Sequence, residues 1–357
     1  MFTSILLIAI ATYLIWRVSE SFDAAATYLT RNLNEGIKGP TVNAIASSLP
    51  ELLISSFFLF YIGNIQGFSA GFATIIGSSI FNIAMIPTIA FLFIFYKQGI
   101  SEFPTNKKII QQDGIFLIIT ELVLLVALYF GGVSITLASI LILLYIFYIC
   151  HVIYTRSKGK KVTIQEKEDH LEENSSSLLK SFLYLDFRNL FFRNKELTTF
   201  KAVTILIVSV IILSVACKQL VDSSEHLSVI FNINLFFVTF FITAIASSIP
   251  DTILSVKDAT NRKYKDSFSN AYASNIFDIC IGIGLPVLVY LIINGVNEIS
   301  TESSAQFSSI IFTSSILLLV FTSVITFIYW LKDINLIRTI LIIVLYIIFL
   351  STIYYIS

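Results

Sequence analysis

Charged side chains are scarce in this chain. Asp, Glu, Lys and Arg together make up 13% of its 357 residues, where soluble domains carry roughly 25%, and this scarcity argues against an ordinary soluble domain. Only three cysteines are present, far apart at positions 150, 217 and 280, so a disulfide framework is not expected. Basic and acidic residues are equal in number, 23 of each, and we expect no nucleic-acid partner.

Hydrophobic sequence is what the chain has in abundance. Hydrophobic residues make up 56% of it, and several runs of about 18–25 residues are long enough to cross the ~30 Å hydrocarbon core of a bilayer. These runs predict an all-α polytopic membrane protein with ten transmembrane helices. No basic residue precedes the first run, which favours a membrane helix over a cleaved signal peptide. The predicted spans are residues 2–16, 38–62, 67–96, 114–130, 132–154, 202–217, 230–256, 267–294, 307–331 and 336–355.

The positions of Lys and Arg predict the orientation of these spans. With ten spans and the N-terminus outside, every basic residue except Lys218 falls in an inner loop, as the positive-inside rule requires. Both termini then lie on the outer side of the cell (inner) membrane, and the long polar segment 155–201 is cytoplasmic. That segment separates a first five-helix membrane repeat, residues 1–154, from a second, residues 202–357.

A twelve-residue motif occurs once in each half. AIASSLPELLIS begins at Ala44 and AIASSIPDTILS at Ala244, and they differ at five positions; farther on, GSSIFNI at Gly77 matches ASNIFDI at Ala273. The loop after the first motif is predicted outside and the loop after the second inside, so the two halves are inverted. Inverted repeats with interrupted helices are typical of secondary transporters whose site lies near the midplane. The repeated regions are residues 38–96 and 230–294.

Each motif combines serines, a proline and an acid. Pro50 and Pro250 predict helix breaks, because proline removes a backbone hydrogen bond and clashes with the preceding turn. Inside a membrane, irregular backbone is tolerated where it lines a cavity, and we expect the breaks to expose carbonyl oxygens near Ala44 and Ala244. Carboxylate, hydroxyl and carbonyl oxygens suit hard cations such as Na⁺ and Ca²⁺. Neither motif contains His or Cys, which argues against zinc or copper.

Three acids fall inside these polar blocks: Glu51, Asp251 and Asp278. An ionised acid at the bilayer centre costs at least ~2.5–3.5 kcal/mol, and no basic residue lies within the blocks, so the counter-charge must come from mobile cations or protons. Glu121, another mid-span acid, has no counterpart in the second repeat, and we interpret it as a satisfied or peripheral group rather than a ligand.

These residues resemble the cation/calcium exchanger family, specifically its sodium/calcium exchangers, whose two α-repeats carry G-[TS]-S-x-P-E and G-S-N-I-F-[ND] blocks. The resemblance implies alternating access, in which the first and sixth helices slide across the core. It also implies that Glu51 and Asp251 are the central Ca²⁺-binding carboxylates, that these carboxylates are shared with Na⁺, and that Asn82 and Asp278 complete the site. The implied hydroxyl ligands are Ser48, Ser78, Ser248 and Ser274, and the implied carbonyl ligands are those of Ala44 and Ala244.

The expected function is therefore secondary active antiport of Na⁺ against Ca²⁺, in the direction of Ca²⁺ extrusion, by a monomer in the lipid bilayer. No enzymatic activity and no cofactor beyond the transported ions are expected. Asp251 with Asp278 resembles the potassium-dependent branch, so K⁺ co-transport stays open, and Ala46 and Ala246 in place of glycine leave the ion affinity open. An H⁺/Ca²⁺ antiporter is the main alternative. A remote one is an intramembrane aspartyl protease, whose G-x-G-D motif the chain lacks.

Overall fold

The computed structural model describes residues 2–31, 37, 39–105, 107–156, 181, 184–192, 197–299 and 305–356. Within these residues the named elements are all helices, accompanied by two isolated β-bridges, Phe103 with Ile334 and Ser134 with Glu298. The predicted all-α fold is confirmed. Most of the predicted cytoplasmic segment 155–201 lies outside the described residues.

Helices of the first half precede the polar segment. They are α1 (Phe2–Leu29), the π-helix η1 (Gly39–Asn43), α2 (Ala44–Ser47), α3 (Leu49–Ile62), α4 (Ile65–Gln98), α5 (Lys107–Ile109), η2 (Ile110–Gly114), α6 (Ile115–Gly131) and α7 (Ile135–Arg156).

The short helix α9 (Phe187–Phe192) lies between the halves. Helices of the second half are α10 (Thr199–Phe231), α11 (Leu235–Val238), η5 (Thr239–Thr243), α12 (Ala244–Ser247), α13 (Ile249–Thr260), α14 (Tyr264–Phe277), η6 (Asp278–Ile283), α15 (Gly284–Asn294), α16 (Ala305–Leu331) and α17 (Leu336–Ile356).

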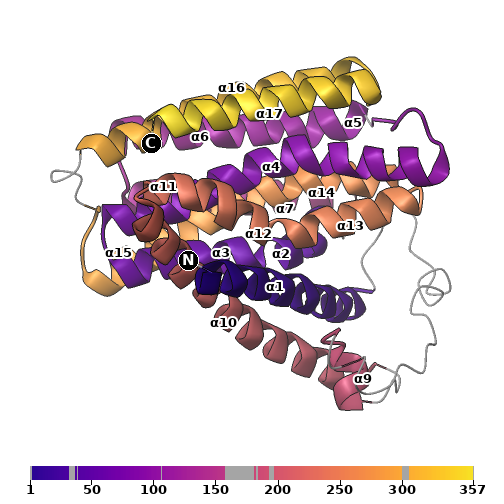
Figure 1. Cartoon of the computed structure of the whole chain (residues 1–357), viewed down its shortest axis with the longest axis horizontal. Helices are drawn as coiled ribbons and strands as arrows, with labels where there is room; N and C mark the ends of the chain where they lie inside the picture. Colours follow the sequence, from indigo (N-terminus) through magenta and orange to yellow (C-terminus); the bar gives the residue numbers. More distant parts are fainter. Residues whose placement is uncertain are drawn as a thin grey trace.

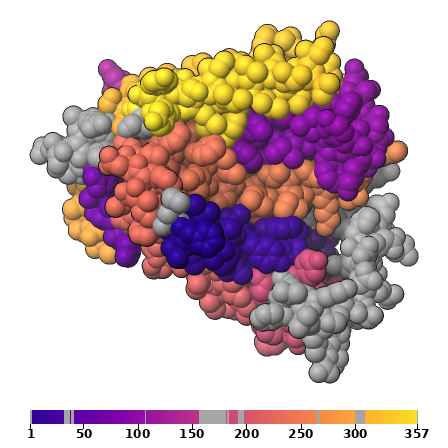
Figure 2. All heavy atoms as spheres, viewed as in Figure 1, coloured from indigo at the N-terminus to yellow at the C-terminus, as the bar shows by residue number. Residues whose placement is uncertain are grey.

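Eight of the described helices are long and apolar enough to cross a membrane, and the number rises to ten if each of two bent pairs forms one span. The bent pairs are residues 41–62 and 235–260, which lie within or close to the predicted spans 38–62 and 230–256. Helices α16, α17 and α6 form one side of the bundle, and α1 with α10 the opposite side (Figure 1). The yellow α16 and α17 and the indigo α1 border the same face, with salmon and orange helices of the second half and part of the purple first half between them (Figure 2). The start of α1 and the end of α17 lie at one end of the bundle, and α9 lies at the other (Figure 1).

Two helices are much longer than their predicted spans. Helix α1 continues to Leu29 instead of ending near residue 16, and α10 continues to Phe231 instead of ending near 217. They pack along each other and share a buried cluster that includes Ile15 and Cys217. At 1.5 Å per residue, the 33 residues of α10 cover about 50 Å, which is more than a bilayer core. The hydropathy pattern missed this because polar residues interrupt the apolar run without interrupting the helix.

Two prolines in the core each leave a backbone carbonyl without its usual hydrogen-bond donor, and a side chain of another helix donates to it instead. Pro87 lies inside α4 and cannot donate to the carbonyl of Ile83, four residues earlier; the hydroxyl of Tyr329 donates to that oxygen at 2.8 Å. Pro286 likewise leaves the carbonyl of Gly282 without its donor, and the hydroxyl of Ser55 donates to it at 2.7 Å. Each proline is therefore tolerated because a distant helix supplies the missing donor.

Removing the Ser55 hydroxyl should destabilise the fold. In Ser55→Ala the buried Gly282 carbonyl loses this donor, and we expect a loss of about 1 kcal/mol, measured as a lower apparent Tm of the purified protein in detergent. Ser56→Ala is the matched control, because the Ser56 hydroxyl bonds only the Leu52 carbonyl of its own helix. Equal shifts for the two variants would contradict the assigned role.

Candidate cation site

The two repeated motifs form bent helices, as their prolines predict. The segment 41–47, which ends with α2, meets α3 at 46°, and the α11–α12 segment meets α13 at 41°. The bends fall at Ser48 and Ser248, and Pro50 and Pro250 occupy the first turn of the helix that follows. A π-helix, η1 or η5, precedes each motif, and single π turns inside helices are frequent at functional sites. The two repeats thus place an interrupted helix at equivalent positions.

The acid of each motif lies at the start of the helix beyond the break. Glu51 is in the first turn of α3 and Asp251 in the first turn of α13, and both side chains are fully buried. The positive end of a helix dipole favours a carboxylate there. Each helix break therefore positions one buried acid and partly stabilises its charge.

Within each repeat, the serine of the second block donates to that acid. The Ser78 hydroxyl on α4 donates to Oε1 of Glu51 at 3.3 Å, and the Ser274 hydroxyl on α14 donates to Oδ1 of Asp251 at 3.2 Å. The two repeats are thus equivalent in contacts as well as in sequence. Asn82, one turn beyond Ser78, donates from Nδ2 to the Ser78 hydroxyl at 3.3 Å.

Serines also join one repeat to the other. The hydroxyl oxygens of Ser78 and Ser248 are 2.9 Å apart, and those of Ser47 and Ser274 are 3.5 Å apart. Each of these pairs takes one serine from the break of one repeat and one from the straight helix of the other. The repeats therefore meet at their polar blocks, and the predicted site residues of both lie in one region of the core.

Asp278 occupies a different setting from its counterpart Asn82. It begins the π-helix η6, whereas Asn82 lies within the uninterrupted helix α4. Both carboxylate oxygens of Asp278 are buried and lack a hydrogen-bond partner, although the hydroxyls of Ser48 and Ser78 lie nearby. When ionised, Asp278 is repelled by Glu51 and Asp251.

Several site oxygens share this condition. One oxygen of each of the other carboxylate and amide candidates is buried and without a hydrogen-bond partner: Glu51 Oε2, Asp251 Oδ2 and Asn82 Oδ1. No described Lys or Arg forms an ion pair with the three acids. Buried oxygen atoms without a donor are costly, and a cation or proton is what would stabilise them. The chemistry of the cluster fits a hard cation held by carboxylates, hydroxyls and an amide.

Two features of the structure limit which groups could hold a cation in this conformation. Among the described residues, no three His, Cys, Asp or Glu side chains converge closely enough to hold a metal by themselves, so the serines and amides are needed to complete a coordination shell. The carbonyls of Ala44 and Ala244, expected to be exposed, are occupied. Each accepts from the backbone N–H of Ser48 or Ser248 and from the hydroxyl of Ser47 or Ser247.

The reason for this difference is the position of the prolines. A proline at position 50 or 250 cannot donate to the carbonyl four residues earlier, which belongs to Ala46 or Ala246. The carbonyls that lose a backbone donor are thus two residues later in the sequence than the oxygens we expected to be exposed.

Sequence reasoning missed Asn270. Its Nδ2 donates to Oδ1 of Asp251 at 3.0 Å, which makes it the second donor to that oxygen. The available signal was spacing: Asn270 lies one helical turn before Ser274 and so shares its face. It escaped notice because the first repeat has Thr74 at the equivalent position.

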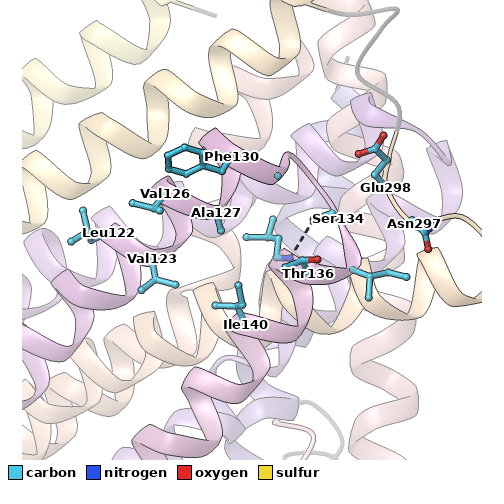
Figure 3. Close-up of a pocket in the computed structure, with 13 residues that line it drawn as sticks. Leu122, Val123, Val126, Ala127, Phe130, Ser134, Thr136, Ile140, Asn297 and Glu298 are labelled. Atoms are coloured by element: carbon cyan, nitrogen blue, oxygen red, sulfur yellow. Dashed lines mark hydrogen bonds between the residues drawn. The ribbon is translucent and has the colours of Figure 1, made fainter.

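Glu121 makes none of these contacts, and its Oε2 is buried without a hydrogen-bond partner. It is buried, and its Oε1 accepts from the Thr322 hydroxyl at 2.8 Å. A groove of about 880 Å³ lies between α6 and α7, lined largely by aliphatic side chains, with Asn297 and Glu298 at one end (Figure 3). None of the predicted site residues lines this groove.

Comparison with known proteins agrees with this arrangement. The family model described as "Sodium/calcium exchanger protein" matches residues 3–154 and 201–355. Curated relatives include sodium/potassium/calcium exchanger 1 of Bos taurus, 36% identical over 83 residues, and sodium/potassium/calcium exchanger 2 of Gallus gallus, 37% identical over 83 residues. Each match covers 23% of this chain but only 7% and 13% of the relative's own length.

Solved structures share the whole fold at low sequence identity. An H⁺/Ca²⁺ exchanger, CAX, aligns with a TM-score of 0.62 and 14% identity over 99% of this chain and 88% of its own. The sodium-calcium exchanger NCX_Mj aligns with a TM-score of 0.55 and 19% identity over 98% of this chain and 97% of its own. With the family model matching most of both halves, the chain belongs to the sodium/calcium exchanger protein family.

Proposed function

We propose that this chain is a secondary active antiporter that exchanges Na⁺ for Ca²⁺ across the membrane by alternating access. The observation that carries the proposal is the pair of broken helices, each of which presents a buried acid, Glu51 or Asp251, with one oxygen unpartnered. Serines from both repeats surround these acids. Ca²⁺ and Na⁺ are the substrates, and no resident cofactor is proposed.

In this proposal the two substrates compete for the same oxygens. Ca²⁺ is held between Glu51 and Asp251, because two carboxylates neutralise a divalent ion and Ca²⁺ takes 6–8 oxygen ligands. Na⁺ ions take the peripheral hydroxyl and amide groups together with a shared carboxylate. Asn82 and Asp278 complete the set, with the hydroxyls of Ser48, Ser78, Ser248 and Ser274 and the Ala44 and Ala244 carbonyls once their serines turn away. Competition for shared acids couples Na⁺ entry to Ca²⁺ release.

Alternating access would come from the pair α1 and α10. They pack along each other on one side of the bundle (Figure 1), and the buried thiol of Cys217 on α10 lies 3.8 Å from the Pro50 carbonyl at the first break. Sliding of this pair past α3 and α13 would open the acids first to one side of the membrane and then to the other.

In the proposed orientation the protein lies in the inner membrane of the cell. Both termini are outside, and segment 155–201 is in the cytoplasm. The support for this orientation is the distribution of basic residues, together with the two chain ends lying at one end of the bundle (Figure 1). In that orientation the direction of transport is Ca²⁺ extrusion, driven by Na⁺ entry.

The driving ion has two further candidates. K⁺ co-transport is favoured by the curated relatives, whose names include potassium, and by Asp251 and Asp278 as the second-repeat acids. H⁺/Ca²⁺ exchange is the alternative for which the H⁺/Ca²⁺ exchanger provides a structural precedent. Membership in a family of exchangers leaves the intramembrane protease without support.

Flux measurements in proteoliposomes separate these candidates. Vesicles loaded with Na⁺ and diluted into Na⁺-free medium containing ⁴⁵Ca²⁺ should accumulate Ca²⁺, whereas vesicles with equal Na⁺ on both sides should not. Adding K⁺ to the outer medium should raise the uptake if K⁺ accompanies Ca²⁺. Uptake driven by a pH gradient alone would instead establish H⁺/Ca²⁺ exchange, and no uptake under any gradient would exclude antiport.

A further inference from the structure

We propose that Asn270 makes the two halves of the site unequal: it positions the Asp251 carboxylate and gives that half a neutral ligand for a monovalent cation. The inference deepens the proposed transport function and relies on the same site. Asn270 lies on α14, one turn before Ser274, and its side chain is buried with 2% of its surface exposed.

The first step concerns how Asp251 is held. Oδ1 of Asp251 accepts from Nδ2 of Asn270 at 3.0 Å and from the Ser274 hydroxyl at 3.2 Å. Two donors on one oxygen fix the rotation of the carboxylate, and the other oxygen, Oδ2, is left without a hydrogen-bond partner. The amide must present its nitrogen here, because an ionised carboxylate only accepts hydrogen bonds.

The second step is the comparison with the first repeat. Thr74 occupies the equivalent position on α4, and its hydroxyl donates to the Ala70 carbonyl of its own helix at 3.1 Å. Glu51 therefore receives no donor from that position. Its side chain is one methylene longer than that of Asp251, so the second repeat combines a shorter acid with an additional donor that the first repeat lacks.

The third step concerns the remaining atom of the amide. The oxygen Oδ1 of Asn270 belongs to the same planar amide group as Nδ2, which faces Asp251. This oxygen is buried and has no hydrogen-bond partner. An amide oxygen adds a cation ligand without adding charge. Beside a single carboxylate it gives a net charge suited to a monovalent cation, whereas a second carboxylate would favour a divalent one. We therefore assign Na⁺ or K⁺ to the Asp251–Asn270 half.

The test is Asn270→Thr, which copies the first repeat, with Thr74→Ala as the matched control. Thermal stabilisation of the purified protein is titrated with NaCl or KCl against choline chloride, because a ligand that binds the folded state raises its Tm. Because the variant loses both the amide oxygen and the donor that fixes Asp251, we expect the half-saturating concentration of the effective cation to rise about tenfold or more, equivalent to about 1.4 kcal/mol. The half-saturating Ca²⁺ concentration should rise less than that of the monovalent cation, because Glu51 also holds Ca²⁺ in the proposed site.

Na⁺ and K⁺ titrations identify which cation this half binds. Thr74→Ala should leave both titrations unchanged. If Asn270→Thr leaves the monovalent titrations unchanged, or if it weakens Ca²⁺ binding as much as monovalent binding, the inference is wrong.

Asn270→Asp, nearly equal in size, replaces Asn270→Thr if that variant fails to fold. It should strengthen Ca²⁺ binding relative to monovalent binding, and the reverse would overturn the proposal. Thermal stabilisation by cations can be measured without transport. If the wild type binds cations but shows no Na⁺-driven Ca²⁺ flux, that result contradicts the antiport proposal and leaves the assignment of Asn270 standing.

Discussion

Replacement of Glu51 by Gln should abolish Na⁺-driven Ca²⁺ uptake, whereas Glu121→Gln should retain most of it. Both acids are buried and each accepts one hydroxyl hydrogen bond, so the two substitutions remove the same charge from similar surroundings. Glu51 alone faces the serines of both repeats. Close contact between a carboxylate and a cation in a water-poor site contributes several kcal/mol, and its loss should reduce flux roughly a hundredfold or more.

The comparison is made in proteoliposomes with matched amounts of folded protein, checked by size-exclusion chromatography. Because glutamine is nearly the size of glutamate and keeps an oxygen that can accept from Ser78 or Thr322, both variants should fold. Equal loss of flux in the two variants would mean that any buried acid is needed for the fold. Retained flux in Glu51→Gln would exclude Glu51 as a central ligand.

Gly77→Ala should prevent assembly of the two repeats. A methyl group on Gly77 would come within 2.0 Å of the Phe240 carbonyl oxygen and 2.8 Å of the Ala244 side chain. The first of these neighbours is backbone, which cannot rotate away, so η5 and α12 would have to move from α4. Overpacking of this kind costs about 3 kcal/mol, and here it separates the serines that join the repeats. We expect little monodisperse protein after extraction in detergent.

Gly131→Ala provides the control. A methyl group there meets only the Ser134 hydroxyl, at 3.5 Å, which is ordinary contact, and alanine is the better helix former. Gly131→Ala should therefore extract as well as the wild type. A normal yield of Gly77→Ala with normal flux would show that η5 can move away from α4 without loss of the site.

Much of the architecture could be predicted from sequence because it depends on local composition. Apolar runs between polar loops predicted the helices, and Pro50 and Pro250 predicted the two breaks, which the structure has at 46° and 41°. The recurrence of AIASS and SxIF blocks indicated that the halves are equivalent. These are properties of single segments, since a proline removes a backbone donor and clashes with the preceding turn wherever it lies in a helix. The ligand set and the inverted orientation remain predictions.

Contacts between segments far apart in sequence depended on the tertiary structure. Motif spacing did not reveal that Ser78 would meet Ser248, that Ser55 would supply the donor that Pro286 removes, or that Asn270 would hold Asp251. Sequence determined which oxygen-bearing side chains each half of this protein presents on its helices. Only packing of one repeat against the other decided which of those oxygens are satisfied and which remain for a cation, because burial leaves each oxygen dependent on the donors that neighbouring helices bring to it.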